Sequence, residues 1–506
     1  MYSSIRSAVL LGIVGAELKV ECDLAQAKCN FTIVGLADKA INESRERCTA
    51  AIFNSGFRFP QKKITINLSP ANIKKEGSHT DLPIAISILE ADGVIEERRT
   101  DDFVFLGELG LDGKIVPIDG VLPMVLSMRD MGFKKFVVPY ENRMECSILD
   151  DVKVYPVKTL KETVDFLNGN LEIAPSHIVE PMDLEPEYDV DFSEIKSQEN
   201  LKRAFEIAAA GNHNILIIGP PGSGKTMAAR RLPTILPDMT LEESIESTKI
   251  YSVSGLLKET GLMRTRPFRS PHHTASSVSI VGGGRIPKPG EVSLAHNGVL
   301  FLDELPEFQR STLEVLRQPM EDKVVSISRI NAQIKYPANF MFVASMNPCP
   351  CGYYGDPNHN CICTQSQIDR YLGKISNPLL DRIDIHVEVN AVKYDELKSD
   401  KPAETSKEIR KRVNKARNRQ IERYKDIGIT NNAELNGKAI KKFIHLGEAE
   451  TQILDMAYKK YKFSARAYNK ILKLSRTIAD LAESDEIKTE HVLEALRYRS
   501  FDSKYF

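Results

Sequence analysis

The sequence contains no apolar run that approaches the roughly 18 residues of a membrane-spanning helix. It also has no marked excess of one charge, because 68 lysine and arginine residues face 69 aspartate and glutamate residues. This balance excludes no class of partner, since local charged patches can still form. The apolar residues 8–16 follow a single arginine, Arg6, and lead into an alternating pattern, which predicts a strand rather than an export signal. We therefore expect a cytoplasmic protein without a membrane partner, whose eight cysteines are reduced.

Residues 172–191 lack lysine and arginine altogether and hold seven carboxylates and three prolines. Such an abrupt change of composition predicts a linker, which we place at residues 169–191. With 506 residues, of which 42% are apolar, the chain can form about two to four domains. Residues 1–168 alternate short strands with helices and predict an α/β or α+β domain of their own. The predicted strands span residues 31–34, 63–67, 103–105 and 136–138, and the predicted helices span residues 37–55 and 81–91.

Two stretches of this first domain, residues 75–81 and 107–120, resemble the proteolytic domain of Lon-type proteases. In those enzymes a serine attacks the substrate and a lysine activates the serine. The matching positions here are His79 and Leu122, and Ser78 lies one place away from the nucleophile position. The resemblance therefore implies a Lon-protease-like (S5-like) fold without its catalytic dyad, used for interaction or assembly rather than peptide cleavage.

Residues 214–226 combine a short apolar run with a glycine-rich turn that ends in a lysine and a threonine. The spacing matches G-x-x-x-x-G-K-[ST], in which the glycines let successive backbone N–H groups approach a phosphate. We expect Lys225 to contact the terminal phosphates of ATP and Thr226 to bind Mg²⁺ through its hydroxyl. A turn without a ligand is the less favoured alternative, because an apolar run precedes it. The predicted ATP-binding residues are Gly219, Pro220, Pro221, Gly222, Ser223, Gly224, Lys225 and Thr226.

A second apolar run, residues 298–302, ends in the carboxylates Asp303 and Glu304. In a parallel sheet the strand ends meet at one edge, so these carboxylates should face the same nucleotide. We expect Asp303 to hold Mg²⁺ and Glu304 to polarise the attacking water, and solvated acids at a strand end are the less favoured alternative. A third apolar run, residues 340–346, ends in Asn347, which would align that water by hydrogen bonding.

The connection between the first two apolar runs is too long and glycine-rich for a plain loop. It carries the adjacent histidines His272 and His273, which could bind a metal or enter the active site. Hydrogen bonding to the backbone is the commoner fate of such histidines and is the preferred interpretation. Later in the chain, residues 311–321 predict a helix, and the alternating residues 324–335 predict a β-hairpin.

Four of the eight cysteines follow the pattern C-x-C-x9-C-x-C. Four thiolates match the tetrahedral coordination of Zn²⁺, which would close a loop that has little core of its own. A structural zinc is the preferred prediction, and free thiols, two disulfides formed during handling, and an iron–sulfur cluster are the alternatives. The predicted zinc ligands are Cys349, Cys351, Cys361 and Cys363.

The last part of the chain is predicted to be helical. Residues 405–425 carry nine lysines and arginines against two glutamates, a pattern that fits a solvated helix face as well as a nucleic-acid contact. The following amphipathic segments, which predict a small all-α lid, are residues 433–445, 448–462, 465–482 and 487–499.

These motifs, together with residues 379–384, stand in the order and spacing of an AAA+ ATPase. More narrowly, the chain resembles the magnesium-chelatase-like AAA+ proteins of the ComM (YifB) type across nearly its whole length. The segments that carry this resemblance are residues 45–60, 68–89, 268–274, 289–296 and 347–352. The resemblance implies an α/β fold with an AAA+ P-loop core at residues 192–392, after the Lon-protease-like domain. An all-α lid of the magnesium-chelatase C-terminal type would follow at residues 393–506.

The same resemblance implies a hexameric ring of identical chains with ATP at each subunit boundary. Arg382 would be the arginine finger that reaches the neighbouring site, and Arg466 would be the second sensor. A helix-2 insert at about residues 281–290 and a pre-sensor hairpin at about residues 324–336 would line the pore.

The function implied by the resemblance is a DNA helicase that promotes branch migration in natural transformation and recombination. The expected contacts to single-stranded or branched DNA are Arg285, Lys288 and Arg329. Two alternatives are the motor subunit of a magnesium chelatase and an assembly or regulatory factor that acts on proteins.

Overall fold

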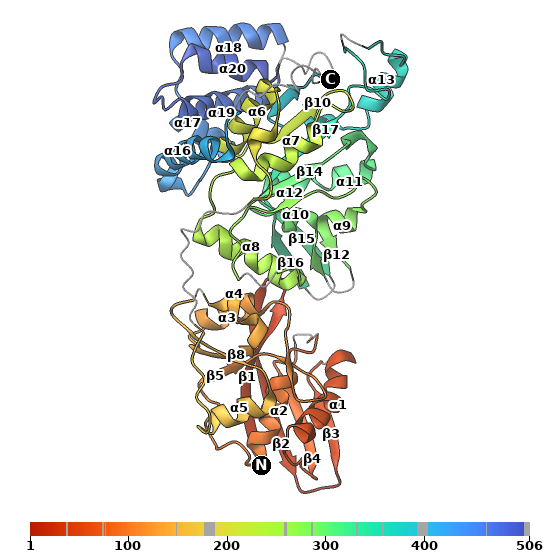
Figure 1. Ribbon diagram of the computed structural model, residues 1–506, viewed down its shortest axis with the longest axis vertical. Coiled ribbons are helices and arrows are strands. Elements are labelled where there is room, and N and C mark those ends of the chain that lie inside the picture. Colours follow the sequence, from red (N-terminus) through yellow and green to blue (C-terminus); the bar gives the residue numbers. More distant parts are fainter. Residues whose placement is uncertain are drawn as a thin grey trace. The chain divides into compact units, whose positions relative to one another are not determined.

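The computed structural model divides the chain into two compact units (Figure 1). Unit 1 contains Met1–Leu184 and Leu241–Met263, and unit 2 contains Glu185–Thr240 and Arg264–Phe506. The residues that the structure describes are 1–36, 39–72, 75, 77–147, 149–176, 188–257, 261–284, 287–329, 332–356, 359–391, 403–461 and 463–499.

A seven-stranded sheet in the order β3-β4-β2-β1-β5-β8-β9 forms the centre of unit 1. Its long strands β1 and β2 pair antiparallel, whereas β5, β8 and β9 run parallel to β1. In β2 the buried Leu18, Val20 and Cys22 alternate with less buried residues, because one face of the strand lies on the core. The strands are β1 (Tyr2–Leu11), β2 (Val14–Ala25), β3 (Asn30–Val34), β4 (Lys63–Ser69), β5 (Phe103–Phe105), β8 (Lys135–Pro139) and β9 (Lys153–Val157), with a small hairpin of β6 (Glu108–Leu109) and β7 (Ile115–Val116).

The helices of unit 1 cover this sheet, and the strands and helices predicted for residues 1–168 are confirmed. Helix α2 lies in the core, with ten of its residues buried, which fits its almost wholly apolar sequence. The helices are α1 (Lys39–Asn54), α2 (Asp81–Ala91), α3 (Val121–Asp130), α4 (Arg143–Cys146), α5 (Leu160–Leu167) and α8 (Leu241–Ser254).

Helix α8 belongs to unit 1 although its sequence lies inside the predicted core range, residues 192–392. The carbonyl of Ser252 accepts a hydrogen bond from the N–H of Gly120 at 3.1 Å. The Ser252 hydroxyl donates to the carboxylate of Glu145 at 2.6 Å. Burial raises the pKa of Glu145. These contacts fasten α8 to the start of α3 and to α4.

Unit 2 is built on a five-stranded parallel sheet in the order β11-β14-β17-β10-β18. The three predicted apolar runs become its central strands and are buried along their whole length, as expected for a parallel sheet that helices cover on both faces. The predicted α/β class is therefore confirmed. The strands are β10 (Ile215–Ile218), β11 (Phe268–Arg269), β14 (Val299–Leu302), β17 (Met341–Met346) and β18 (Ile385–Glu388).

The predicted hairpin is present as β15 (Val324–Arg329) and β16 (Ala332–Pro337), and a second small hairpin joins β12 (Gly282–Gly283) to β13 (Lys288–Pro289). The single helix predicted at residues 311–321 is wrong. The structure has two short helices there, α11 (Arg310–Glu314) and α12 (Arg317–Asp322). Pro319 explains the break, because its ring has no N–H and would clash with the carbonyl of Val315 in a continuous helix.

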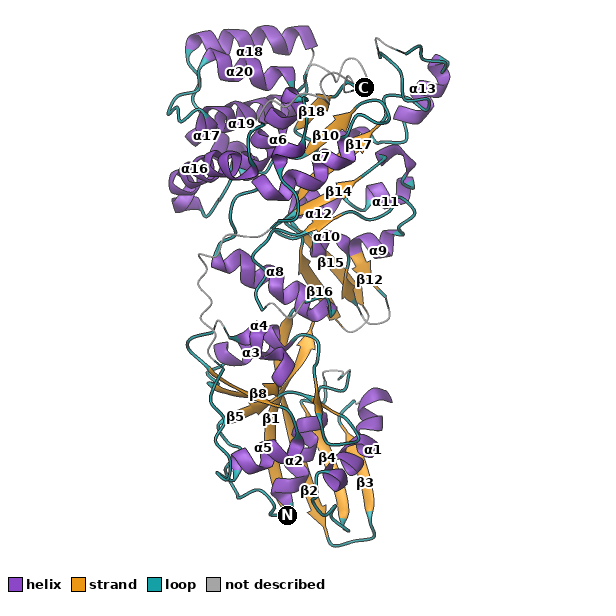
Figure 2. Cartoon of the chain, in the orientation of Figure 1, coloured by secondary structure: helices purple, strands orange, loops and turns teal. Residues whose placement is uncertain are grey.

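The other helices of unit 2 follow the predicted order, and Figure 2 shows that its last part is helical. Helix α16 packs against α6 and α19, so the lid shares one hydrophobic core with the helix that precedes β10. The helices are α6 (Glu199–Gly211), α7 (Lys225–Arg231), α9 (Ser277–Val281), α10 (Glu291–Leu294), α13 (Gln365–Leu372), α14 (Asn377–Leu380), α16 (Ser406–Tyr424), α17 (Gly437–Phe443), α18 (Glu448–Tyr461), α19 (Ala465–Leu481) and α20 (Thr489–Arg497).

Candidate active site and cysteine cluster

The glycine-rich turn connects the end of β10 to the start of α7. Gly222 and Gly224 have positive φ angles of 75° and 82°, which side chains other than glycine rarely adopt. A Cβ atom on Gly219 would lie 2.5 Å from the carbonyl oxygen of Val389, so no larger residue fits there. The turn therefore has the local structure that the phosphate-binding pattern requires.

Lys225 is buried at the first position of α7 and points back into this turn. Its Nζ donates to the carbonyl oxygens of Gly219 and Pro220, at 2.8 Å each. Burial lowers the pKa of Lys225 to about 8, although the nearby carboxylates of Asp303 and Glu304 favour its charged form. The lysine is thus held at the phosphate turn in a setting that favours an additional negative charge.

The predicted magnesium ligands lie together. The Thr226 hydroxyl donates to Asp303 Oδ2 at 2.5 Å, across the gap between the phosphate turn and the end of β14. A hydroxyl and a carboxylate are oxygen donors of the kind that Mg²⁺ prefers, so this pair fits the ion. The hydroxyl of Ser345, a fully buried residue of β17, donates to Asp303 Oδ1. Sequence reasoning did not identify Ser345, because a serine inside an apolar strand gives no signal of its own.

Glu304 follows Asp303 directly after β14 and has a positive φ of 52°. His273 Nδ1 lies 3.9 Å from Glu304 Oε2. The ring of His272 packs on that of His273 at 4.0 Å between centroids, and His272 Nδ1 also accepts a hydrogen bond from the backbone N–H of Thr274. The two histidines therefore differ: His272 makes the local contact that was preferred for both, whereas His273 lies near the carboxylate of Glu304.

Asn347 lies directly after β17, beside β10 in the sheet. Its Oδ1 accepts a hydrogen bond from Lys225 Nζ at 3.2 Å. The structure thus brings five predicted residues to one edge of the sheet, where the strands end: Lys225, Thr226, Asp303, Glu304 and Asn347.

Arg382 lies at the other end of the same strands. Its backbone precedes β18, whose first residue, Ile385, pairs with Ile215 at the start of β10. The guanidinium of Arg382 donates to the carbonyl of Pro378 at 2.6 Å and to the carboxylate of Glu321. Arg382 is therefore separated from the phosphate turn by the length of β10, which is about 13 Å.

Arg466 is exposed in the first turn of α19. One helical turn later, Lys470 donates to the carbonyl of Ile383 at 2.8 Å, at the same end of β18 as Arg382. Among the described residues, the structure shows no hydrogen bond or ion pair between Arg466 and the five residues around Lys225.

The predicted DNA contacts are described only in part. Lys288 is exposed in β13, close to the hairpin turn. Arg329 ends β15 and pairs with Ala332 in the backbone ladder, but its side chain lies outside the described residues. Arg285 also lies outside the described residues.

The basic face of α16 is engaged in contacts within the chain. Arg412 pairs with Glu206 and Glu404, and Arg423 forms a bidentate pair with the fully buried Asp480. Other pairs join Lys415 to Glu483 and Arg419 to Asp485. These partners favour the structural interpretation of this helix over a nucleic-acid contact.

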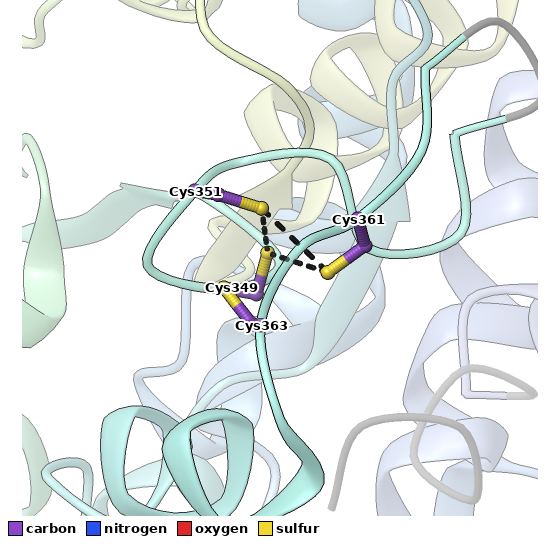
Figure 3. A group of neighbouring side chains, drawn as sticks. All are labelled: Cys349, Cys351, Cys361 and Cys363. Carbon is purple, nitrogen blue, oxygen red and sulfur yellow. Dashed lines mark hydrogen bonds between the residues drawn. The ribbon is translucent and has the colours of Figure 1, made fainter.

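The four cysteines of the predicted zinc site converge on one point. All four are free, and their sulfur atoms lie within 4.8 Å of one another. The separations are 3.3 Å for Cys349–Cys351, 3.7 Å for Cys349–Cys361 and 3.6 Å for Cys351–Cys361 (Figure 3). Four sulfurs at 2.3 Å from a tetrahedral Zn²⁺ would be about 3.8 Å apart. The donor set therefore fits a tetrahedral metal ion.

Neither of the two Lon-like positions carries the serine or the lysine of the Lon-type dyad. His79 lies in the turn before α2, and Leu122 is buried in the first turn of α3. The N–H of Leu122 donates to Glu145 Oε2 at 3.2 Å, the carboxylate that also receives Ser252 of α8. Helix α8 is thus held directly beside the position that a catalytic lysine would occupy.

Comparison with known proteins agrees with this arrangement. The family model described as magnesium chelatase, subunit ChlI, matches residues 191–397. Related models, described as subunit ChlI of Mg-chelatase and as magnesium chelatase, subunit ChlI C-terminal, match residues 20–142 and 403–499. The competence protein ComM of Haemophilus influenzae is 42% identical over 498 residues, which cover 98% of this chain and 96% of that protein. The chain belongs to the magnesium-chelatase-like ComM (YifB) family.

Two other relatives extend this assignment. The YifB protein of Escherichia coli is 40% identical over 501 residues, which cover 99% of this chain and 97% of that protein. Lon protease 2 of Bacillus subtilis is 29% identical over 180 residues, 32% of each chain. Membership of the ComM (YifB) family, with its AAA+ core, supports ATPase activity with ATP and Mg²⁺. Within the described part of the chain, no helix combines the length and apolar character needed to cross a membrane.

Proposed function

We propose that this protein is an ATP-driven motor that acts on DNA as a ring of six identical chains. The observation that carries the proposal is the split of the predicted catalytic groups between the two ends of one sheet. Lys225 lies at one end and Arg382 at the other, about 13 Å apart along β10. An arginine side chain cannot span that distance within one chain, so Arg382 is proposed to complete the site of a neighbouring chain.

The proposed hydrolysis uses the residues around the phosphate turn. Lys225 balances charge on the terminal phosphates, and Thr226 and Asp303 hold Mg²⁺, which supplies further charge neutralisation when bound. Glu304 takes a proton from the attacking water, which Asn347 orients toward the terminal phosphorus. The bond from that phosphorus to the bridging oxygen then breaks, so that ADP and phosphate leave. Arg382 of the neighbouring chain is proposed to stabilise the charge that develops during this step, and Arg466 to respond to the bound nucleotide.

Two observations support DNA as the partner. The first is the 42% identity with a protein named for competence, which leads us to propose branch migration of single-stranded or branched DNA during transformation. The second is the pair of hairpins that carry Lys288 and Arg329. Both residues, together with Arg285, are proposed to face the pore of the ring. Contacts from such residues to phosphates make DNA binding fall steeply as salt rises.

The cysteine cluster is proposed to hold a structural Zn²⁺. Its four sulfurs lie within 4.8 Å of one another, and Cys349 is fully buried in the core below the loop. We propose a cytoplasmic location as well, because thiols stay reduced there. The N-terminal domain is proposed to serve interaction or assembly and not peptide cleavage, since His79 and Leu122 stand at the dyad positions.

The test is the rate of ATP hydrolysis with and without single-stranded or forked DNA. We expect DNA to raise this rate, and we expect Lys288→Ala to weaken the stimulation and its dependence on salt. Lys411→Ala, which alters an exposed lysine of α16, is the matched control. If no DNA structure changes the rate of ATP hydrolysis, a role as an assembly or regulatory factor that acts on proteins is favoured. If a porphyrin with Mg²⁺ raises the rate, the magnesium-chelatase role is favoured.

A further inference from the structure

Two cations of the helical lid hold the main chain directly after Arg382. Lys470 Nζ donates to the carbonyl oxygen of Ile383 at 2.8 Å, and Arg499 Nη1 donates to the same oxygen at 2.8 Å. Ile383 is fully buried, so its carbonyl depends on these donors rather than on water. The carbonyl of Arg382 itself accepts a hydrogen bond from Asn214 Nδ2 at 2.8 Å.

The next residue, Asp384, ties the same turn to helix α19 a second time. Asp384 Oδ1 lies 3.4 Å from Lys470 Nζ, and Asp384 Oδ2 lies 3.4 Å from His213 Nδ1. On its other side, His213 Nε2 lies 2.8 Å from the hydroxyl of Thr477, which is also on α19. Burial opposes the charge of Asp384, but the charge of Lys470 and the hydrogen bond from His213 outweigh it and hold the pKa of Asp384 below its usual range.

The contacts between α19 and the turn of Arg382 also link that turn to Arg466. Arg466 and Lys470 are four positions apart on α19, so they lie one above the other on the same face of the helix. A shift of α19 that follows nucleotide contact at Arg466 would therefore reach the turn of Arg382 through the buried Lys470. Broken hydrogen bonds in a buried turn are costly, so the turn would move with the helix.

We propose that Lys470 is a positioning residue for Arg382: it joins the arginine turn to helix α19, so that the lid sets where Arg382 stands in the neighbouring site. This role rests on the proposed function, because it requires a site that two chains share. Lys470 would therefore affect catalysis at the site of the next chain, although Lys470 itself does not contact the nucleotide.

Mixed rings test this role in the full-length chain. A receiving chain carries Arg382→Ala and keeps its phosphate turn, whereas a donating chain carries Lys225→Ala and keeps Arg382. Neither hydrolyses ATP alone, and mixing the two is expected to restore hydrolysis at the shared boundaries. Lys470→Met is then placed either in the donating or in the receiving chain.

In the donating chain, Lys470→Met is expected to lower the restored rate by about 10- to 100-fold, because a small displacement of a catalytic group has an effect of that size. In the receiving chain the same substitution should leave the restored rate close to that of the parental mixture. Lys470→Arg in the donating chain, which keeps a donor, should recover most of the rate.

Lys473→Met is the matched control. Lys473 lies on the same helix and is also largely buried, but it donates to the carbonyl of Ala433 at 2.8 Å instead of to the arginine turn. In the donating chain, Lys473→Met should not lower the restored rate. Thermal unfolding of the Lys470→Met and Lys473→Met variants is measured to compare their stability.

Two results would overturn the positioning role: the same loss of restored rate whichever chain carries Lys470→Met, or no loss when the donating chain carries it. Failure of the parental mixture to hydrolyse ATP would instead overturn the shared site, and the role of Lys470 with it.

Discussion

The hydroxyl of Thr226 lies 2.5 Å from a carboxylate oxygen of Asp303, although 77 positions separate them in the chain. The contact arises because β10 and β14 are parallel strands of one sheet, with β17 between them, and both end at the same edge. The fold thus places two oxygen donors from distant segments where one Mg²⁺ can bind both. Ser345, at the end of β17, fixes the other oxygen of Asp303.

The first prediction concerns Ser345. Ser345→Ala removes the hydrogen bond that orients Asp303, and loss of such an outer partner typically lowers metal affinity or activity by about 10- to 100-fold. We therefore expect the Mg²⁺ concentration for half-maximal hydrolysis to rise, as measured by Mg²⁺ titration of the ATPase rate. Ser293→Ala is the control, because Ser293 is also fully buried in unit 2 but lies in α10. An unchanged Mg²⁺ requirement in Ser345→Ala would contradict the role of this hydroxyl.

The second prediction concerns Glu304 and its neighbour His273. Glu304→Gln should bind ATP normally and lose about 10²- to 10⁴-fold in hydrolysis, since it cannot accept the proton of water. His273→Ala should also lower kcat while ATP affinity stays nearly unchanged, because His273 lies beside the carboxylate of Glu304 and is not placed at the phosphate turn. Single-turnover hydrolysis and ATP binding, measured separately, give both values.

His272→Ala is the matched control for this second prediction. His272 packs on His273, but its own hydrogen bonds go to Thr274. We expect a smaller effect on hydrolysis than from His273→Ala. Normal hydrolysis by Glu304→Gln would mean that another group activates the water.

Much of the fold and of the site followed from local sequence. Apolar runs of strand length, each ending in a glycine-rich turn, a pair of carboxylates or an amide, predicted the parallel strands and the edge where they meet. The residues that directly follow these strands lie close together because the strands end at the same edge of the sheet. Lys225, Asp303 and Asn347 could therefore be predicted from the sequence. The cysteine spacing predicted a cluster for the same reason, since short loops leave the four thiols little freedom.

The rest depended on contacts that no local pattern encodes. Helix α8 has the composition of an ordinary helix, and only the three-dimensional structure reveals that it packs on α3 in unit 1. Lys470 of α19 and Arg499, which donate to the carbonyl of Ile383, likewise lie more than 80 positions away in the chain. His273 was ambiguous in sequence, because a histidine in a loop is compatible with either a backbone contact or a catalytic one.

The third prediction is a pH dependence of ATP binding. Lys225 has a pKa of about 8 in the structure without ligand, and the phosphates of bound ATP would raise that pKa by favouring the charged lysine. Below about pH 8 the lysine is already charged, so affinity should change little. As pH rises through about 8 the free protein loses this proton and must regain it on binding, so affinity should fall. Calorimetry in buffers of different ionisation enthalpy should detect proton uptake above pH 8, and affinity that is constant up to pH 9.5 would contradict this assignment.

The fourth prediction concerns the cysteine cluster. Purified under reducing conditions, the protein should contain about one Zn²⁺ per chain, and Cys361→Ser should remove most of it, because three thiolates close the tetrahedral site poorly. Loss of the metal should expose the loop around Cys349 to proteolysis and lower the temperature of unfolding, since metal binding contributes directly to the folding of such loops. Cys29→Ser is the control, as Cys29 is an exposed cysteine of unit 1 and is not one of the four cysteines of the cluster. Metal analysis and limited proteolysis of the two variants measure this difference.

Two outcomes would contradict the prediction. Protein that is free of metal, with four reactive thiols and a protease-resistant loop, would exclude a structural zinc. Bound iron with a visible absorption band would show that the four cysteines hold an iron–sulfur cluster instead of zinc.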